Sequence, residues 1–144
     1  DATEILKRTN DYIGVDISSK LIKRAQEKNP SGKFETADIT SYDFPKKLDI
    51  VFAFASLIHL DKDELREVLK KIHESLAASG VVRISMKYNA EYAEVTTTDE
   101  FGTRTYYHYS DKEIIELAEG FSLLKNTIVD RGTQKWVELI LQKV

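Results

Sequence analysis

Apolar residues in this chain fall into short runs and into helical stripes, and the two patterns alternate along the sequence. Short runs rich in β-branched and aromatic residues predict buried strands. We expect strands over 12–17, 33–37, 48–54, 81–86, 121–129 and 135–144, with a hairpin turn at 130–133 joining the last two.

Stripes of apolar residues three and four positions apart predict the helices. We expect helices over 2–10, 18–28, 61–77 and 110–119. The last two begin with capping boxes, from Asp61 to Glu64 and from Ser110 to Glu113. Gly80 and Gly120 are expected to stop them.

Residues 88–109 follow neither period and are rich in polar and aromatic residues. We expect a long excursion there, with a short hairpin of its own around 95–105. Long loops in compact domains are usually functional.

Strands and helices in this order predict the α/β class, as a doubly wound, Rossmann-like and mostly parallel sheet. The two final strands would add an antiparallel hairpin at one edge. A length of 144 residues suits one domain, so we expect a single domain over 1–144.

Composition narrows the function by exclusion. The net charge is −3 and the basic residues are scattered, which argues against a nucleic-acid partner. The absence of cysteine excludes disulfides and cysteine-ligated metals and fits a cytoplasmic protein. No apolar run reaches the ~18 residues of a membrane span, so no membrane role is expected. The three histidines lack metal-ligand spacing, so we predict no metal site.

Asp16 ends the first predicted strand, at the edge where ligands bind in open α/β sheets. A carboxylate there can accept hydrogen bonds from both hydroxyls of a ribose, and Ile17 can lie against a purine. From position alone, Asp16 is equally well explained as a cap of the helix that follows.

Asp38 occupies the corresponding place after the second strand. Its carboxylate can accept from an adenine amino group, and the N–H of Ile39 can donate to a ring nitrogen. The alternative is an Asp that forms the turn over 38–41. Two carboxylates at the ends of successive strands favour a nucleoside site more strongly than either carboxylate does by itself.

Four ordered segments resemble class I S-adenosylmethionine-dependent methyltransferases. They are Tyr12–Ser18 (YIGVDIS), Thr36–Ile39 (TADI), Leu48–Leu60 (LDIVFAFASLIHL) and Ser79–Met86 (SGVVRISM). The helix entry at 106–111 and Gly120-Phe121 are also similar to members that act on small molecules. The resemblance extends over essentially the whole chain.

The resemblance implies S-adenosyl-L-methionine as the cofactor and assigns residues to it. Asp16 and Ile17 would bind the ribose and adenine, and Asp38 and Ile39 the adenine edge. Ala53 and Phe54 would lie along the methionine part. His59 would stand near the methyl-transfer site as a candidate base, although it could also simply close the loop before Asp61.

Candidate substrate residues come from the excursion and its border. Tyr106 and Tyr107 can supply apolar walls with polar tips. Lys87 ends a strand at the ligand edge and can meet an anionic substrate. In the alternative interpretation the tyrosines pack the excursion onto the body and Lys87 is a solvated loop residue.

One feature of the family is absent from this sequence. The family's first strand lies between the strands over 12–17 and 48–54 and ends in a GxGxG-type loop, which does not occur here. We therefore expect an N-terminally incomplete domain, or a strand supplied by another copy. Loss of that strand would expose two apolar sheet edges that can pair with other copies.

The leading hypothesis is thus a methyltransferase that acts on a small molecule by direct methyl transfer. One alternative is an NAD-dependent dehydrogenase, which also places an acidic residue after its second strand. Another is a non-catalytic remnant that serves as a binding module.

Overall fold

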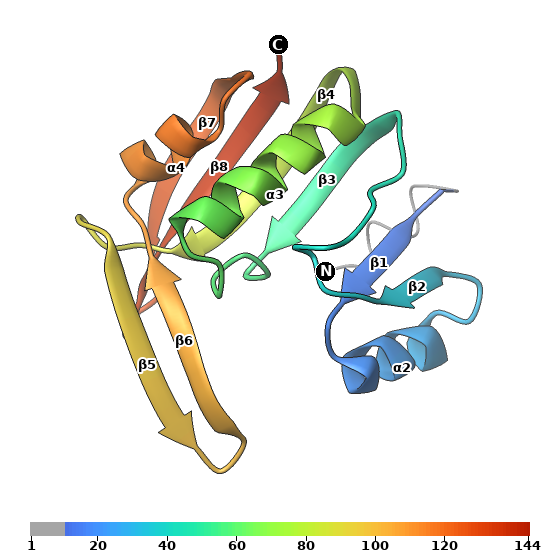
Figure 1. The fold of residues 1–144 in the computed structure, drawn as a ribbon, viewed down its shortest axis with the longest axis horizontal. Helices are drawn as coiled ribbons and strands as arrows, with labels where there is room; N and C mark the ends of the chain where they lie inside the picture. Colours follow the sequence, from blue (N-terminus) through green and yellow to red (C-terminus); the bar gives the residue numbers. More distant parts are fainter. Residues whose placement is uncertain (1–10) are drawn as a thin grey trace. The chain divides into compact units, whose positions relative to one another are not determined.

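The computed structural model describes residues 11–144, which form two compact units, described separately below (Figure 1). The first unit is described over 11–42 and the second over 43–144. The helix predicted over 2–10 lies outside the described residues.

The first unit is a strand–helix–strand crossover. It consists of β1 (Ile13–Asp16), α2 (Ser19–Lys28) and β2 (Lys33–Thr36). The strands pair in parallel, with Asp16 opposite Thr36, so both carboxyl ends reach the same edge. Ser18 is the N-cap of α2, and its hydroxyl accepts a hydrogen bond from the N–H of Leu21 at 3.3 Å.

The second unit is a mixed sheet with helices on one face. Its strands, in the spatial order β3-β4-β8-β7, are β3 (Leu48–Phe54), β4 (Leu76–Lys87), β8 (Lys135–Lys143) and β7 (Phe121–Asp130). Strands β3 and β4 are parallel, and the β7–β8 hairpin is antiparallel, as predicted. Helices α3 (Lys62–Ser75) and α4 (Asp111–Leu117) lie over the same face (Figure 1). Both predicted capping boxes are present.

The core of the second unit lies between this face and the two helices. Alternate residues of the central strands point to it and are at most 1% exposed: Val82, Ile84 and Met86 in β4, and Val137, Leu139 and Leu141 in β8. The stripe of α3 that covers them is equally buried and runs through Leu65, Val68, Leu69 and Ile72. The period of two in the strands and the helical stripe thus meet in one apolar layer.

The opposite face of this sheet carries large apolar side chains that stay accessible. In β3, Ile50, Phe52 and Phe54 are 51%, 39% and 45% exposed. The guanidinium of Arg83, on the neighbouring strand, lies 5.3 Å from the ring centre of Phe54.

The end of α3 departs from the prediction. The helix stops at Ser75, and Leu76 is already extended, with φ −68° and ψ 143°. Leu76 pairs with Leu48 of β3, so sheet pairing ends the helix five residues before Gly80, which is part of β4 and not a helix stop. A Cβ on Gly80 would lie 3.0 Å from the carbonyl oxygens of Ala77 and Leu48, so glycine permits a close approach there.

The excursion contains the predicted hairpin, in a longer form. Its strands are β5 (Ala93–Asp99) and β6 (Gly102–His108). A two-stranded hairpin is marginal by itself in water, so its anchor matters. The N–H of Tyr107 donates to the carbonyl of Ile58 at 2.9 Å, and the N–H of Tyr109 to that of Lys87 at 3.1 Å. The fully buried hydroxyl of Tyr109 donates to the carbonyl of Leu60 at 2.7 Å.

Shortening one core side chain tests the position of the core. Leu139→Ala is expected to lower the free energy of unfolding by about 2–5 kcal/mol, because it leaves a cavity in the buried layer. Leu123→Ala, on the neighbouring strand with 45% exposure, is the matched control and should cost much less. Denaturant unfolding followed by the fluorescence of the single tryptophan, Trp136, measures both. Equal losses would contradict the placement of Leu139 in the buried layer.

Removing one hydroxyl tests the hairpin anchor. Tyr109→Phe is expected to destabilise the protein by about 1–3 kcal/mol, because the buried carbonyl of Leu60 loses its donor. Tyr88→Phe is the control, since no hydrogen bond to the Tyr88 hydroxyl is found among the described residues. A stability unchanged by Tyr109→Phe in the same denaturant assay would mean that this bond does not hold the hairpin.

Candidate active site

The parallel pairing of β3 and β4 brings their carboxyl ends to one edge of the second unit. The last pair is Phe54 with Ser85, and the N–H of Ala55 then donates to the carbonyl of Ser85 at 2.9 Å. Ala55 has φ 52°, a left-handed conformation that is strained for a residue with a side chain. Such strain costs about 1–3 kcal/mol and concentrates at functional sites. Nothing in the sequence indicated it.

His59 lies in the loop that leaves β3, and its ring is oriented by the hairpin. Its Nδ1 lies 2.7 Å from the carbonyl oxygen of Thr105 in β6. A carbonyl can only accept, so Nδ1 carries the hydrogen and donates. In the neutral ring Nε2 is then free of hydrogen and can take up a proton. His59 is exposed, so this nitrogen is open to a ligand.

Lys87, Tyr106 and His59 come together at this edge. The Nζ of Lys87 lies 3.7 Å from the ring centre of Tyr106, within the range of a cation–π contact. The ring of His59 lies 4.6 Å from that of Tyr106 on centroids, tilted by 42°. Two predicted substrate residues and the predicted base thus form one cluster.

Tyr107 points the other way. Neighbouring residues of a strand project to opposite faces, and Tyr107 stacks on Tyr92 with ring centres 6.1 Å apart. The structure therefore does not bring Tyr107 to Lys87 and Tyr106.

His108 joins the cluster and was missed from the sequence. It follows Tyr106 by two positions in β6, so both side chains project from the same face of the hairpin. Burial and the charge of Lys87 lower the pKa of His108, and burial lowers the pKa of Lys87. The period of two in β6 is the signal that could have found it, once the strand bounds were known.

Ala53 and Phe54 lie at the end of β3 and project to opposite faces. Ala53 is 4% exposed in the layer under α3, whereas Phe54 is 45% exposed beside Arg83. Of the two side chains, only the ring of Phe54 is accessible to a ligand.

In the first unit, Asp16 and Asp38 follow the carboxyl ends of paired strands. The N–H of Ala37 donates to the carbonyl of Asp16 at 3.1 Å, and this bond joins the segments that leave β1 and β2. The Asp16 Oδ1 accepts from the N–H of Ser18 at 2.8 Å, but the N-cap of α2 is Ser18 itself. Ile17 is 72% exposed, which leaves its side chain open to a planar ligand.

Asp38 does form the predicted turn. Its Oδ1 accepts from both the N–H and the hydroxyl of Thr40, at 2.9 and 2.7 Å, and its carbonyl accepts from Ser41. Ile39 lies within this turn and is half-buried. The turn fixes the backbone of Asp38 and Ile39 at the strand exit, where the resemblance places the adenine edge.

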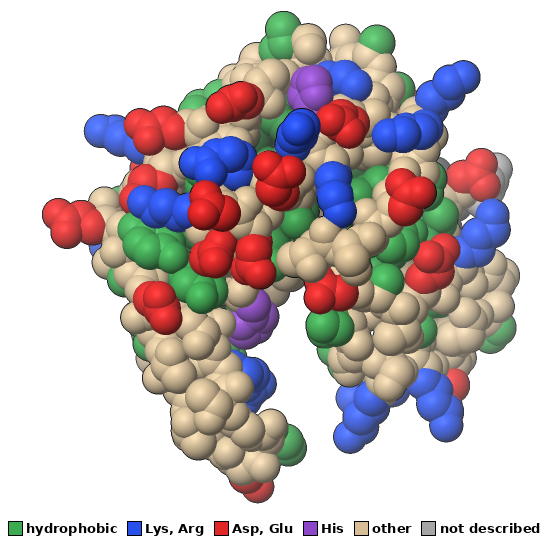
Figure 2. All heavy atoms as spheres, in the orientation of Figure 1, with side chains coloured by type: hydrophobic (Ala, Val, Ile, Leu, Met, Phe, Trp, Pro, Cys, Tyr) green, Lys and Arg blue, Asp and Glu red, His purple; other side chains and the backbone are tan. Residues whose placement is uncertain are grey.

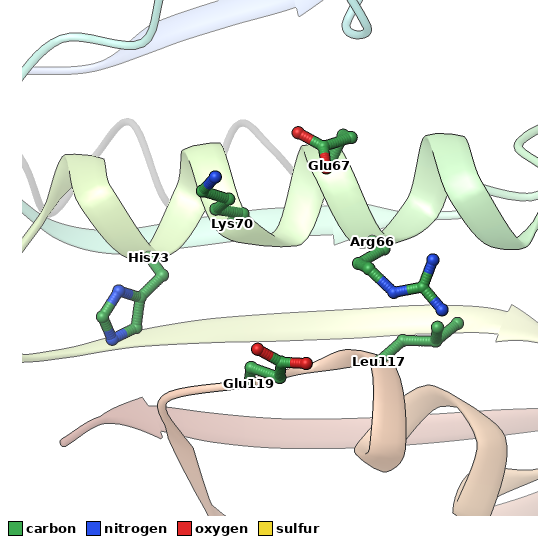
Figure 3. Close-up of a pocket in the computed structure, with 6 residues that line it drawn as sticks. All are labelled: Arg66, Glu67, Lys70, His73, Leu117 and Glu119. Carbon is green, nitrogen blue, oxygen red and sulfur yellow. The ribbon is translucent and has the colours of Figure 1, made fainter.

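A pocket elsewhere on the second unit is a poor alternative. It lies between α3 and the end of α4 and is lined by Arg66, Glu67, Lys70, His73, Leu117 and Glu119 (Figure 3). Two of its polar side chains are engaged within the protein. Arg66 pairs with Asp63 at 2.8 Å, and the Nε2 of His73 hydrogen-bonds the carbonyl of Gly120 at 3.1 Å.

Two features are absent from the described residues. Over 11–144 no group of three or more His, Cys, Asp or Glu could hold a metal ion. In the same part of the chain, no helix has the length and apolar character needed to cross a membrane.

Comparison with known proteins gives a family match and two kinds of relative. Residues 1–80 match the family described as methyltransferase domain, more than half of the chain. A carboxy-S-adenosyl-L-methionine synthase of Helicobacter pylori is 28% identical over 137 residues, 90% of this chain and 55% of the relative. A trans-aconitate 2-methyltransferase of Afipia carboxidovorans is 30% identical over 94 residues, 63% of this chain and 36% of the relative. The chain thus spans about half the length of the Helicobacter relative.

Solved structures share the fold. A methyltransferase of Methanosarcina mazei, described as S-adenosylmethionine-dependent, superposes with a TM-score of 0.86 at 16% identity, over 99% of this chain and 86% of that one. The Burkholderia thailandensis 1,6-didemethyltoxoflavin-N1-methyltransferase, solved with bound 1,6-didemethyltoxoflavin and S-adenosylhomocysteine, superposes with a TM-score of 0.78 at 19% identity, over 99% of this chain and 65% of that one.

These findings confirm the α/β fold class and the resemblance seen in the sequence, and nothing in them supports the nicotinamide-dependent alternative. The matched residues 1–80 include both strand-end carboxylates, Asp16 and Asp38. The chain belongs to the methyltransferase domain family and has the fold of S-adenosylmethionine-dependent methyltransferases.

Proposed function

We propose that residues 1–144 belong to one methyltransferase domain that transfers the methyl group of S-adenosylmethionine to a small molecule. The observation that carries the proposal is the pair of carboxylates, Asp16 and Asp38, at the same edge of a parallel strand pair within the family match. Both relatives in sequence bear names that involve S-adenosylmethionine or methyl transfer.

The donor and acceptor chemistry of the first unit suits the adenosine part of this cofactor. Ribose hydroxyls and the adenine amino group all donate hydrogen bonds, and ionised carboxylates only accept them. Asp16 would take the ribose hydroxyls, Asp38 the amino group and the N–H of Ile39 a ring nitrogen. Ile17, with 72% of its surface exposed, offers an apolar contact for the base.

In the second unit, Ala53 and Phe54 would lie along the methionine part. When bound, the cofactor would supply a methyl group on a sulfonium, open to attack by an electron pair of the acceptor with sulfur as the leaving group. The chain's part is to hold the acceptor in line and to exclude water.

His59 is proposed as the group that removes a proton from the acceptor. Its Nδ1 is engaged with Thr105, so Nε2 is the nitrogen that can accept. Lys87 and Tyr106 beside it would contact the acceptor, and Tyr107 would act indirectly, through Tyr92, by holding the hairpin.

Three further expectations go with this function. We propose a cytoplasmic location, because the sequence contains no cysteine. We propose that nucleic acid is not a partner, because the basic residues are scattered along the sequence. Association with another copy through apolar sheet edges is proposed from the sequence pattern and is testable by sedimentation.

Cofactor binding by calorimetry tests the proposal. We expect the full-length protein, with the strand and glycine-rich loop that residues 1–144 lack, to bind S-adenosylhomocysteine and not NAD. Asp16→Ala should weaken binding by about 1–3 kcal/mol, because the ribose hydroxyls lose a charged acceptor. Glu27→Ala removes an exposed carboxylate from α2 of the same unit and is the matched control.

The opposite pattern would refute it. Binding of NAD without S-adenosylhomocysteine would favour the dehydrogenase alternative, and binding of neither would favour a non-catalytic module. Equal affinities of Asp16→Ala and Glu27→Ala would remove the ribose assignment alone.

A further inference from the structure

We propose that Lys87 and His108 bind a carboxylate group of the methyl acceptor, with the ring of Tyr106 as the floor of the site. The inference rests on the proposed function and names the substrate class of the same site. It uses a histidine to which neither the sequence nor the resemblance gave a role.

Lys87 is a cation held in place without a counter-ion. Its ammonium lies over the Tyr106 ring at 3.7 Å, and its side chain is half-buried at the end of β4. Among the described residues no carboxylate lies within 4.0 Å of it, whereas the arginines at 83, 104 and 131 and Lys62 all have carboxylate partners. A half-buried cation in contact with a ring face alone retains its capacity to bind an anion.

His108 supplies an unused hydrogen-bonding atom beside this cation. Its Nε2 is buried and has no hydrogen-bond partner in the described structure. Buried polar atoms of this kind are rare, because each costs about 1–3 kcal/mol when unsatisfied. The parallel bridge between Tyr88 and Tyr109 brings the preceding residues, Lys87 and His108, next to each other in register, so their side chains project to the same side. Burial, and then the charge of Lys87, lower the pKa of His108, which favours the neutral imidazole.

The two faces of the hairpin differ in charge. Tyr107 pairs across the hairpin with Glu94, so a carboxylate shares its face. On that face burial, Tyr107, Glu94 and Asp61 raise the pKa of Tyr92. His108 pairs instead with Ala93, and Tyr106 with Val95, so no acidic residue comes from β5 beside them. The acidic residue of β5 on the Tyr106 face, Asp99, lies at the far end of the hairpin and is paired with Arg104. Near His108 this face therefore offers an anion the charge of Lys87 with no carboxylate of β5 directly opposite.

Figure 2 shows a histidine and a basic side chain on one flank of the hairpin, and acidic and basic side chains interspersed over α3.

The number of charges points to a carboxylate. One ammonium and one neutral N–H donor match a group with a single negative charge and two acceptor oxygens. A phosphate carries nearly two charges and three acceptor oxygens at pH 7, so it would leave charge unneutralised. The Afipia relative is named for trans-aconitate, a tricarboxylate, which makes that compound a suitable probe.

The test uses the full-length protein saturated with S-adenosylhomocysteine and a series of probes: acetate, succinate, trans-aconitate, the trimethyl ester of trans-aconitate, and inorganic phosphate. Dissociation constants come from NMR titration, and the imidazole signals of His108 are followed directly. We expect trans-aconitate to bind, to shift the His108 signals, and to bind better than its ester or phosphate.

Two variants locate the effect. Lys87→Met keeps the side-chain stem over Tyr106 and should raise the dissociation constant for trans-aconitate roughly tenfold or more. His108→Ala should raise it on the order of fivefold. Lys125→Met, at an exposed site on β7, is the matched control and should bind like the unaltered chain. All three variants should keep the affinity for S-adenosylhomocysteine.

Each failure has a distinct meaning. If the unaltered full-length protein does not bind S-adenosylhomocysteine, the proposed function is refuted together with this inference. If that binding is intact, four results would each overturn this inference alone. The ester could bind as tightly as trans-aconitate, or Lys87→Met could leave the affinity for trans-aconitate unchanged. Phosphate could bind more tightly than trans-aconitate, or no carboxylate in the series could bind.

Discussion

The parallel pairing of β3 with β4 is the constraint on which the candidate site depends. Parallel strands send their carboxyl ends to one edge, so the loop with Ala55 and His59 emerges beside Lys87. An antiparallel partner would have placed Lys87 at the far end of the sheet. The helix α3 makes this pairing possible, since it carries the chain back over the face that Val82, Ile84 and Met86 bury.

The hairpin β5–β6 extends this edge and depends on it in turn. Backbone bonds from Tyr107 and Tyr109 and the buried Tyr109 hydroxyl tie its base to both strand exits. Burial, with Tyr92 and Asp61 as further causes, raises the pKa of Tyr109 well above its usual range, so the hydroxyl stays protonated and keeps donating. This anchoring brings Tyr106 under the ammonium of Lys87 and His108 into register with it, and a separate hydrogen bond to the carbonyl of Thr105 orients His59.

Much of this architecture could be predicted from sequence, because local patterns and tertiary packing agree. The run over 48–54, both capping boxes and the last hairpin have physical causes that lie within a few residues. The end of α3 was misjudged at Gly80, because pairing of Leu76 with Leu48 is a contact between distant segments. The left-handed Ala55 also depends on its surroundings and leaves no trace in composition.

Some residues of the candidate site could also be predicted from the sequence, and others depend on contacts between distant segments. Asp16, Asp38 and Lys87 are strand-end residues, and their places follow from the order of strands. Which of Tyr106 and Tyr107 faces Lys87 depends on the register of β6, and a shift of one residue would exchange them. His108 shares the face of Tyr106 by the period of two, but the strand bounds and its unpartnered buried nitrogen are visible only in the structure.

The central proposal is that the strand ends at Asp16 and Asp38, which share one edge of the first unit, bind the adenosine part of S-adenosylmethionine. Amide chemical shifts of the labelled full-length protein, recorded with and without S-adenosylhomocysteine, test it most directly. Within the first unit, the largest changes are expected at 16–18 and 38–40. Changes confined to the pocket along α3, or to the turn at 130–133, would contradict it.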